Sequence, residues 1–265
     1  MDNDVYGLDG KPVGKIGMPA IFSGDFRPDL IRRAILSSES KRYQPQGHSV
    51  LAGLQTTAVY VGKYSGYRRG RHMGIAIRPR QKLGGGAMGD VRRIPSSVKG
   101  KRAHPHMIEK RITEEMNRRE FLKAVESAIA GTAKSKLISQ RHDTGSKNLP
   151  IVVDDSIEDI SKAKELLKLL VALGLSKDLD LSKKPRIRKG LRRSSRQRRF
   201  RKSVLVVTDN DSKIAKAGRN IPGVDVCSTS SLDIEKLAPG AEPRLSVWSR
   251  SAVNGIEKKL SEAKK

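Results

Sequence analysis

The chain has 265 residues and a formal net charge of +26, from 54 lysines and arginines against 28 aspartates and glutamates. This excess of positive charge favours a polyanion, above all nucleic acid, as the partner. The single cysteine, Cys227, excludes an internal disulfide framework, and the lack of a long apolar segment excludes a membrane-spanning helix, so we expect a cytosolic protein with no secretory signal.

The first elements along the chain are a hairpin and two helices. Apolar residues alternate from Val5 to Ile16 around Asp9-Gly10, a dipeptide that favours a tight turn. A helix is expected after Pro19, with Asp29 near its start. Helical spacing of apolar residues returns near position 113 and ends at Gly131, which predicts a second helix capped by that glycine.

From Leu149 onward, short valine-rich runs alternate with helical patterns. Strands are expected at 151–153, 204–207, 224–227 and 245–248, and helices at 157–173, from 211, at 232–237 and at the C-terminal end. This alternation is typical of a parallel sheet that is covered by helices on both faces. The sequence therefore predicts an α/β fold, a doubly wound and mainly parallel sheet body that is interrupted by a long extended basic loop and by a second basic insertion.

The predicted body is discontinuous, with residues 1–41 and 108–265 forming one globular unit. The interruption, 42–107, is rich in glycine and arginine and has no apolar periodicity. Loops longer than about fifteen residues are uncommon and are usually functional or disordered. The side chains that we expect to bind RNA in and beside this loop are Lys41, Arg42, Lys63, Arg68, Arg69, Arg71, Arg78, Arg80, Lys82, Arg92, Arg93, Lys99, Lys101, Arg102 and His104.

A second basic segment, 183–202, contains no acidic residue. So dense a block of like charge repels itself and stays extended unless phosphates neutralise it. We therefore expect both basic segments to become ordered on RNA. The RNA-binding candidates in this segment are Arg186, Arg188, Lys189, Arg192, Arg193, Arg196, Arg198, Arg199 and Arg201.

Three patterns suggest other chemistry. Residues 84–89 match the dinucleotide spacing GxGxxG, with Glu109 about twenty residues further on, but no helical pattern follows, which favours glycines used for flexibility. Asp154, Asp155, Asp209 and Asp211 follow predicted strands and could hold magnesium, although helix capping explains all four. His104-Pro105-His106 lacks zinc spacing, and imidazoles among arginines favour contacts with RNA.

Several segments resemble one family in the correct order. The chain is similar to the L-four (L4) family of large-subunit ribosomal proteins, in its archaeal and eukaryotic-type branch. The segments that carry this resemblance are Met18–Phe22, Phe26–Ala34, Ala52–Ala58, Lys101–Pro105, Ser127–Ala130, Leu237–Gly240 and Arg244–Trp248.

The resemblance implies a structural constituent of the large ribosomal subunit that binds large-subunit rRNA, supports assembly and lines the polypeptide exit tunnel with its internal loop. It implies no enzymatic activity, no homo-oligomer, no membrane contact and no cofactor beyond structural magnesium of the rRNA. The expected partners are rRNA, neighbouring ribosomal proteins and the nascent polypeptide, in the cytoplasm. The tunnel-lining candidates are Lys63, Tyr64, Tyr67, Arg68, Arg69, Arg71, His72 and Met73.

Two other function classes remain alternatives at this point. One is an RNA-modifying enzyme whose basic segments hold the substrate, and the other is a free basic protein that condenses nucleic acid without a defined site. Tyr60, Tyr64 and Tyr67 are expected either to stack on bases or to hold the two arms of the loop together.

Overall fold

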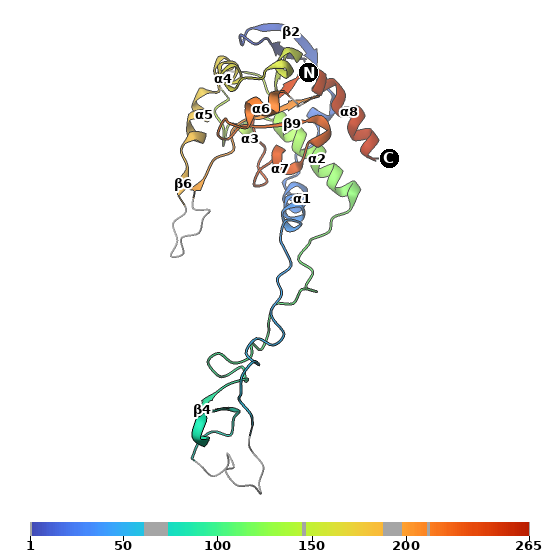
Figure 1. The fold of residues 1–265 in the computed structure, drawn as a ribbon. Coiled ribbons are helices and arrows are strands. Elements are labelled where there is room, and N and C mark those ends of the chain that lie inside the picture. The colour runs from blue at the N-terminus through green and yellow to red at the C-terminus, as the bar shows by residue number, and fades with distance from the viewer. Residues whose placement is uncertain (1, 61–73, 145–146, 188–197, 211–212, 265) are drawn as a thin grey trace. The chain divides into compact units, whose positions relative to one another are not determined.

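The computed structural model describes residues 2–60, 74–144, 147–187, 198–210 and 213–264. The chain divides into two compact units (Figure 1). We call Met1–Ser40 with Glu114–Lys265 the body, and Lys41–Thr113 the loop unit. The bounds of the loop unit lie slightly outside the predicted 42–107.

The body contains a six-stranded sheet, with helices that cover it. Its six strands are β1 (Asp2–Tyr6), β2 (Pro12–Gly17), β5 (Ile151–Val153), β8 (Leu205–Thr208), β9 (Asp225–Ser228) and β10 (Ser246–Ser249). Its α-helices are α1 (Pro28–Ser40), α2 (Arg118–Ala133), α3 (Ser135–Ile138), α4 (Ala163–Ala172), α5 (Ser176–Lys183), α6 (Ile214–Gly218), α7 (Ile234–Leu237) and α8 (Arg250–Lys264). Short 3₁₀ helices are η1 (Ala20–Ser23), η3 (Asp155–Asp159) and η4 (Thr229–Ser231).

The sheet has the strand order β2-β1-β5-β10-β8-β9. Only the hairpin β1–β2 is antiparallel, and all other pairs in this sheet are parallel. The parallel strands β5 and β8 are buried along their whole length, as expected for a sheet with helices on both faces. The prediction of a doubly wound, mainly parallel α/β body is confirmed.

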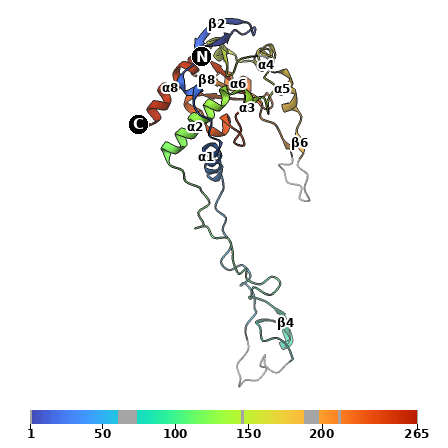
Figure 2. The same ribbon diagram turned by 180° about the vertical axis from the view of Figure 1, so that it is seen from behind.

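Alternate strand residues face two separate cores. Val152, Leu205 and Trp248 pack with α1, α2, α7 and α8, whereas their neighbours Val153 and Val206 pack with α4, α5 and α6. The two helical layers lie on opposite faces of the sheet (Figure 2). This arrangement follows directly from the period of two along a strand. Among the described helices, none combines the length and the apolar character that crossing a membrane requires.

Several predicted helix boundaries are wrong, among them the start near position 113, since α2 begins at Arg118, and two others that tertiary contacts explain. The helix expected at 157–173 is divided into η3 and α4, and the residues between them, including Ile160 and Lys162, have extended backbone. The predicted cap Gly131 instead lies inside α2, which continues to Ala133. Tertiary contacts explain these two differences: Glu158 in η3 accepts hydrogen bonds from Asp209 and from Ser251 of α8, and Gly131 lies against the ring of Phe26.

Gly131→Ala is expected to destabilise the body by about 1–3 kcal/mol, because overpacking of a tight core forces neighbours to move. A Cβ atom at this position would lie 2.9 Å from the Phe26 ring and 3.2 Å from Cβ of Pro243. Gly255→Ala in α8 is the matched control, since its nearest atom would be 3.8 Å away. This control is expected to stabilise the helix by about 0.5–1 kcal/mol. Urea unfolding of both variants measures the difference, and equal effects would contradict the packing argument.

Candidate nucleic-acid interface

The loop unit has a small framework of its own. Strands β3 (Arg80–Lys82) and β4 (Met88–Val91) form an antiparallel pair, joined by the 3₁₀ turn η2 (Gly84–Gly86). Val59 adds a bridge on the other side of β3, with backbone N···O distances of 3.2 and 3.4 Å between Val59 and Arg80. The bridge between Val59 and Arg80 connects residues about twenty positions apart, so local periodicity could not reveal it.

The glycine pattern at 84–89 lies in this hairpin. Gly85 and Gly86 have φ of 70° and 81°, the left-handed conformation that glycine adopts at little cost. The chain after the turn is strand β4, and a pyrophosphate site needs the N-terminus of a helix there. The glycines at 84–89 therefore serve the hairpin turn, and the geometry does not fit a dinucleotide site.

Most described candidates in the loop unit present their charge to solvent. Asp90 and Glu109 are the only acids between positions 41 and 113. A surface of one sign is the electrostatic footprint of a polyanion partner. The exposed candidates are Lys41, Arg42, Arg78, Lys82, Arg93, Lys99, Lys101, Arg102 and His104.

Three arginines also hold the loop unit together, a role that the sequence reading missed. Arg93 donates to the carbonyl of the fully buried Ala58 at 3.1 Å. The half-buried Arg92 donates to the Val98 carbonyl at 2.8 Å and pairs with Asp90 at 3.0 Å. Arg80 donates to the carbonyl of Ala76 at 3.2 Å. Binding of these three side chains to RNA stays a prediction.

Some candidates lie outside the described residues. They are Lys63, Tyr64, Tyr67, Arg68, Arg69, Arg71, His72 and Met73 of the first basic segment, and Arg188, Lys189, Arg192, Arg193 and Arg196 of the second. Their roles stay predictions.

The second basic segment starts at the end of α5 and its two arms pair. Strands β6 (Arg186–Ile187) and β7 (Arg198–Arg199) are antiparallel, with Arg186 opposite Arg199. The side chain of Arg186 is exposed. Two buried polar clusters lie where this segment returns to the body.

The first cluster is centred on Asp178 of α5. Its carboxylate lies 2.9 Å from Nδ1 of His142, accepts a hydrogen bond of 2.6 Å from Ser203, and pairs with Arg201 at 3.3 Å. The Asp178 and His142 side chains are completely buried. Arg201, predicted to bind RNA, is thus tied to the body.

The second cluster is centred on Arg244, which is completely buried. Its Nε donates to the Ser203 carbonyl at 2.8 Å, and Nη2 donates to the carbonyls of Val204 and Gly223 at 2.8 and 2.6 Å. Its Nη1 pairs with Asp225 at 2.6 Å, and Lys202 pairs with the same carboxylate. The two clusters fix the chain on the C-terminal side of the basic segment.

Both carboxyl groups have a lowered pKa. Burial alone would raise the pKa of Asp178, but hydrogen bonds from His142 and Ser203 and the charge of Arg201 outweigh it. Burial likewise opposes the shift at Asp225, where the charge of Arg244 and the bonds from Lys202 and Arg244 lower the pKa. Each group therefore stabilises the folded state most when it is ionised.

The free energy of unfolding is expected to fall as the pH drops below about 4. The contribution of a carboxyl with a depressed pKa is fully present above its unfolded value, near 3.9, and is lost as the pH falls through the folded value. Urea unfolding from pH 6 to pH 3 measures this slope. The slope should be shallower for Asp178→Asn and Asp225→Asn than for the exposed control Asp9→Asn, and three equal slopes would contradict the assignment.

The carboxylates at the C-terminal edge of the sheet hold loops together. Asp155 accepts from the backbone N–H of Ser251 at 2.7 Å, which caps α8, and Glu158 accepts from the N–H of Asp209 at 2.9 Å. Asp209 pairs with Lys259 at 2.6 Å, and this hydrogen bond lowers its pKa. Asp155 thus caps a helix other than the one expected. Within the described ranges, no three His, Cys, Asp or Glu side chains are grouped as a metal site.

The sequence reading also overlooked Arg244 and Asp178 as organisers of the second segment. One feature of the sequence does point to Arg244, because this arginine directly precedes the predicted strand Leu245–Trp248. Its side chain must therefore either be buried with hydrogen-bond partners or extend to solvent. Nothing in the sequence distinguishes Asp178 from Asp180, the other acid of its helix.

Comparison with known proteins gives consistent results. The family model described as "Ribosomal protein L4/L1 family" matches residues 16–259. A large ribosomal subunit protein uL4 of Methanococcoides burtonii is 40% identical over 257 residues, 96% of this chain and 97% of that protein. The uL4 protein of Methanocaldococcus jannaschii is 39% identical over 97% of this chain and 98% of its own length. The uL4 protein of Archaeoglobus fulgidus is 38% identical over 96% of this chain and 97% of its own length. The chain belongs to the ribosomal protein L4/L1 family.

Proposed function

We propose that this protein is a structural constituent of the large ribosomal subunit that binds large-subunit rRNA, supports its assembly and lines the polypeptide exit tunnel with its long loop. The observation that carries the proposal is the loop unit, whose exposed charged side chains are nearly all basic, in a member of a ribosomal protein family. This family membership also confirms the prediction that the chain is not an enzyme. Its location is the cytoplasm, within the subunit.

Arginine and lysine contacts to phosphates supply the affinity in this proposal, and the framework of the loop unit orients them. The body is the folded anchor, and Arg201 and Lys202, at the C-terminal end of its second basic segment, are held by the Asp178 and Arg244 clusters. Neighbouring ribosomal proteins and the nascent polypeptide are the further partners. No cofactor is required, and the only associated ions are magnesium ions of the rRNA.

Sedimentation of a tagged chain, after washes of rising salt, tests the proposal. We expect one copy for each large subunit, retained at salt concentrations that strip peripheral proteins, because many phosphate contacts are formed together. Quantitative release at moderate salt that leaves intact subunits would overturn it.

Tunnel lining has a separate test. Cys227 is the only cysteine and is buried, so Tyr64→Cys introduces a single accessible thiol. We expect this thiol to form a disulfide with a cysteine in a stalled nascent chain, whereas Ser96→Cys in the same unit should not. Equal capture by both positions would contradict the role of the predicted tip.

A further inference from the structure

The loop unit contains a cavity of about 240 Å³ between β3, β4 and the segment 75–78. A single water occupies about 30 Å³ of liquid, so the cavity is large enough for a ring system. Its walls are mainly apolar and come from Val59, Ile77, Leu83 and Met88. Ile77 is 49% and Leu83 54% exposed, so the loop unit leaves this apolar surface uncovered.

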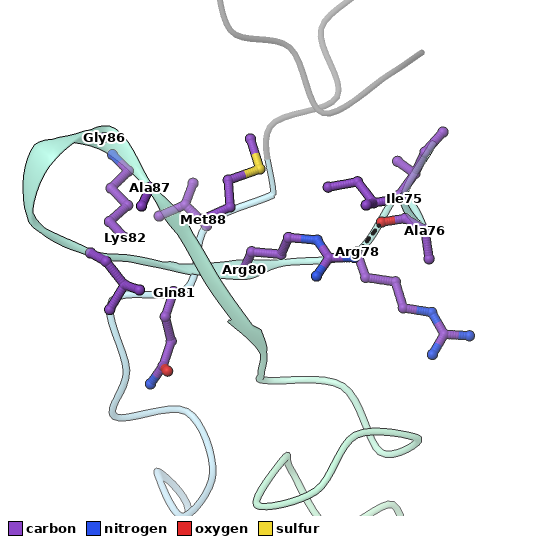
Figure 3. Close-up of a pocket in the computed structure, with 12 residues that line it drawn as sticks. Ile75, Ala76, Arg78, Arg80, Gln81, Lys82, Gly86, Ala87 and Met88 are labelled. Atoms are coloured by element: carbon purple, nitrogen blue, oxygen red, sulfur yellow. Dashed lines mark hydrogen bonds between the residues drawn. The ribbon is translucent and has the colours of Figure 1, made fainter. Parts of the chain in front are cut away.

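A flat cation lies inside this apolar cavity. Figure 3 shows Arg80 of β3 between Met88 and Ala76, with its guanidinium bonded to the Ala76 carbonyl. The bond measures 3.2 Å and restrains the orientation of the group. Nε of Arg80 is buried and has no hydrogen-bond partner within the described residues. Arg78, two residues earlier, directs its guanidinium away from Met88 (Figure 3).

The surroundings of the cavity are basic. Lys82 and Arg78 stand at its rim, and the nearby acid Asp90 is already paired with Arg92. An apolar peptide could use the walls, but it would gain nothing from the positive rim. A nucleotide matches the apolar walls, the guanidinium and the basic rim together. Its base packs on apolar side chains and on the guanidinium plane, and its phosphate contacts the basic rim.

We propose that this cavity binds one unstacked nucleobase of the large-subunit rRNA. The base lies against the guanidinium of Arg80 and the side chains of Met88 and Ile77, and Lys82 contacts the adjoining phosphate. The inference rests on the proposed function, since it assigns a specific RNA contact to the same loop unit.

Photo-crosslinking in assembled subunits tests the occupant. A diazirine analogue of methionine is placed only at position 88 of the full-length tagged chain, and large subunits are irradiated after purification. We expect a crosslink to one rRNA nucleotide, mapped as a stop in reverse transcription. The same analogue at position 98 is the control, because Val98 is 81% exposed in the same unit but does not line the cavity.

A pair of matched variants tests the stacking role. A reagent that modifies unpaired bases is applied to subunits that carry Arg80→Lys or Arg111→Lys, both of which keep the charge; Arg111 is exposed in the same unit and does not line the cavity. The crosslinked nucleotide should become about ten-fold more reactive with Arg80→Lys, within the range for loss of one stack between a base and a side chain. Arg111→Lys should leave its reactivity unchanged.

The outcomes separate the two proposals. Absence of the wild-type chain from the large-subunit peak would refute the proposed function itself. Presence of the chain in that peak, with position 88 captured by a protein or by nothing, would refute only the nucleobase inference. Equal reactivity of the nucleotide in the two arginine variants would also refute it.

Discussion

Arg244→Met is expected to lower the free energy of unfolding of the protein by about 3–5 kcal/mol, the usual cost of removing one partner of a buried ion pair. The guanidinium donates to three backbone carbonyls and to Asp225, and Arg244 itself is completely buried. Methionine fills similar space but removes the guanidinium from Asp225 and from the Ser203 carbonyl, whereas the carbonyls of Val204 and Gly223 keep backbone N–H donors. Each buried acceptor left unsatisfied costs about 1–3 kcal/mol.

Urea unfolding followed by the fluorescence of Trp248 measures this loss, because that residue is the only tryptophan and is fully buried. Arg33→Met is the matched control, since Arg33 pairs with Glu120 at 2.5 Å but is 59% exposed. An exposed pair of this kind contributes less than about 1 kcal/mol. Similar losses in the two variants would contradict the structural role of Arg244.

Arg244→Lys separates charge from hydrogen bonding. Lysine keeps a positive charge near Asp225, but a single ammonium cannot reproduce the planar fork that reaches the carbonyls of Val204 and Gly223. We expect a loss between those of the wild type and Arg244→Met. If lysine restored full stability, the ion pair alone would account for the role of Arg244.

The link from this cluster to function is the second basic segment. Ser203 and Val204 follow that segment directly, and Lys202 and Arg201 at its end are paired with Asp225 and Asp178. A charged segment that is already fixed at one end loses less conformational entropy when it binds RNA and becomes ordered. The loss of Arg244 should therefore increase proteolytic cleavage near position 202 as well as lower stability.

The sequence was sufficient for the sheet and insufficient for the contacts that organise the basic segments. Strands such as Ile151–Val153 are apolar throughout because helices cover both faces, and this pattern is local. The interruption after η3 depends instead on Glu158, whose bonds reach Asp209 and Ser251 far along the chain. Long-range polar contacts of this kind leave no periodic signal.

The loop unit shows the same limit. Its composition indicated RNA, and the exposure of residues such as Lys101 and Arg102 agrees with that expectation. Composition did not indicate that Val59 pairs with Arg80, or that Arg80 lies in an apolar cavity. The apolar residues there have no helical or strand period, because the turns between them change the direction of the chain.

Gly53→Ala is expected to reduce incorporation of the chain into large subunits at least about ten-fold, in competition with the wild type. Gly53 has φ of +78°, where a non-glycine residue costs about 1–2 kcal/mol. A Cβ atom would also lie 2.5 Å from the carbonyl oxygen of Gly100 and 2.7 Å from the nitrogen of Lys101. These are backbone atoms, so the two arms must separate, at a further cost of about 1–3 kcal/mol.

Gly85→Ala isolates the effect of this close approach. Gly85 also has a positive φ, +70°, but a Cβ atom there would meet nothing within 4 Å. It should therefore show only the conformational cost, and Gly53→Ala should exceed it by the cost of separating the arms. The ratio of variant to wild-type chain in purified subunits measures both. If the two variants entered subunits equally well, the crossing of the arms at Gly53 and Gly100 would not be required for assembly.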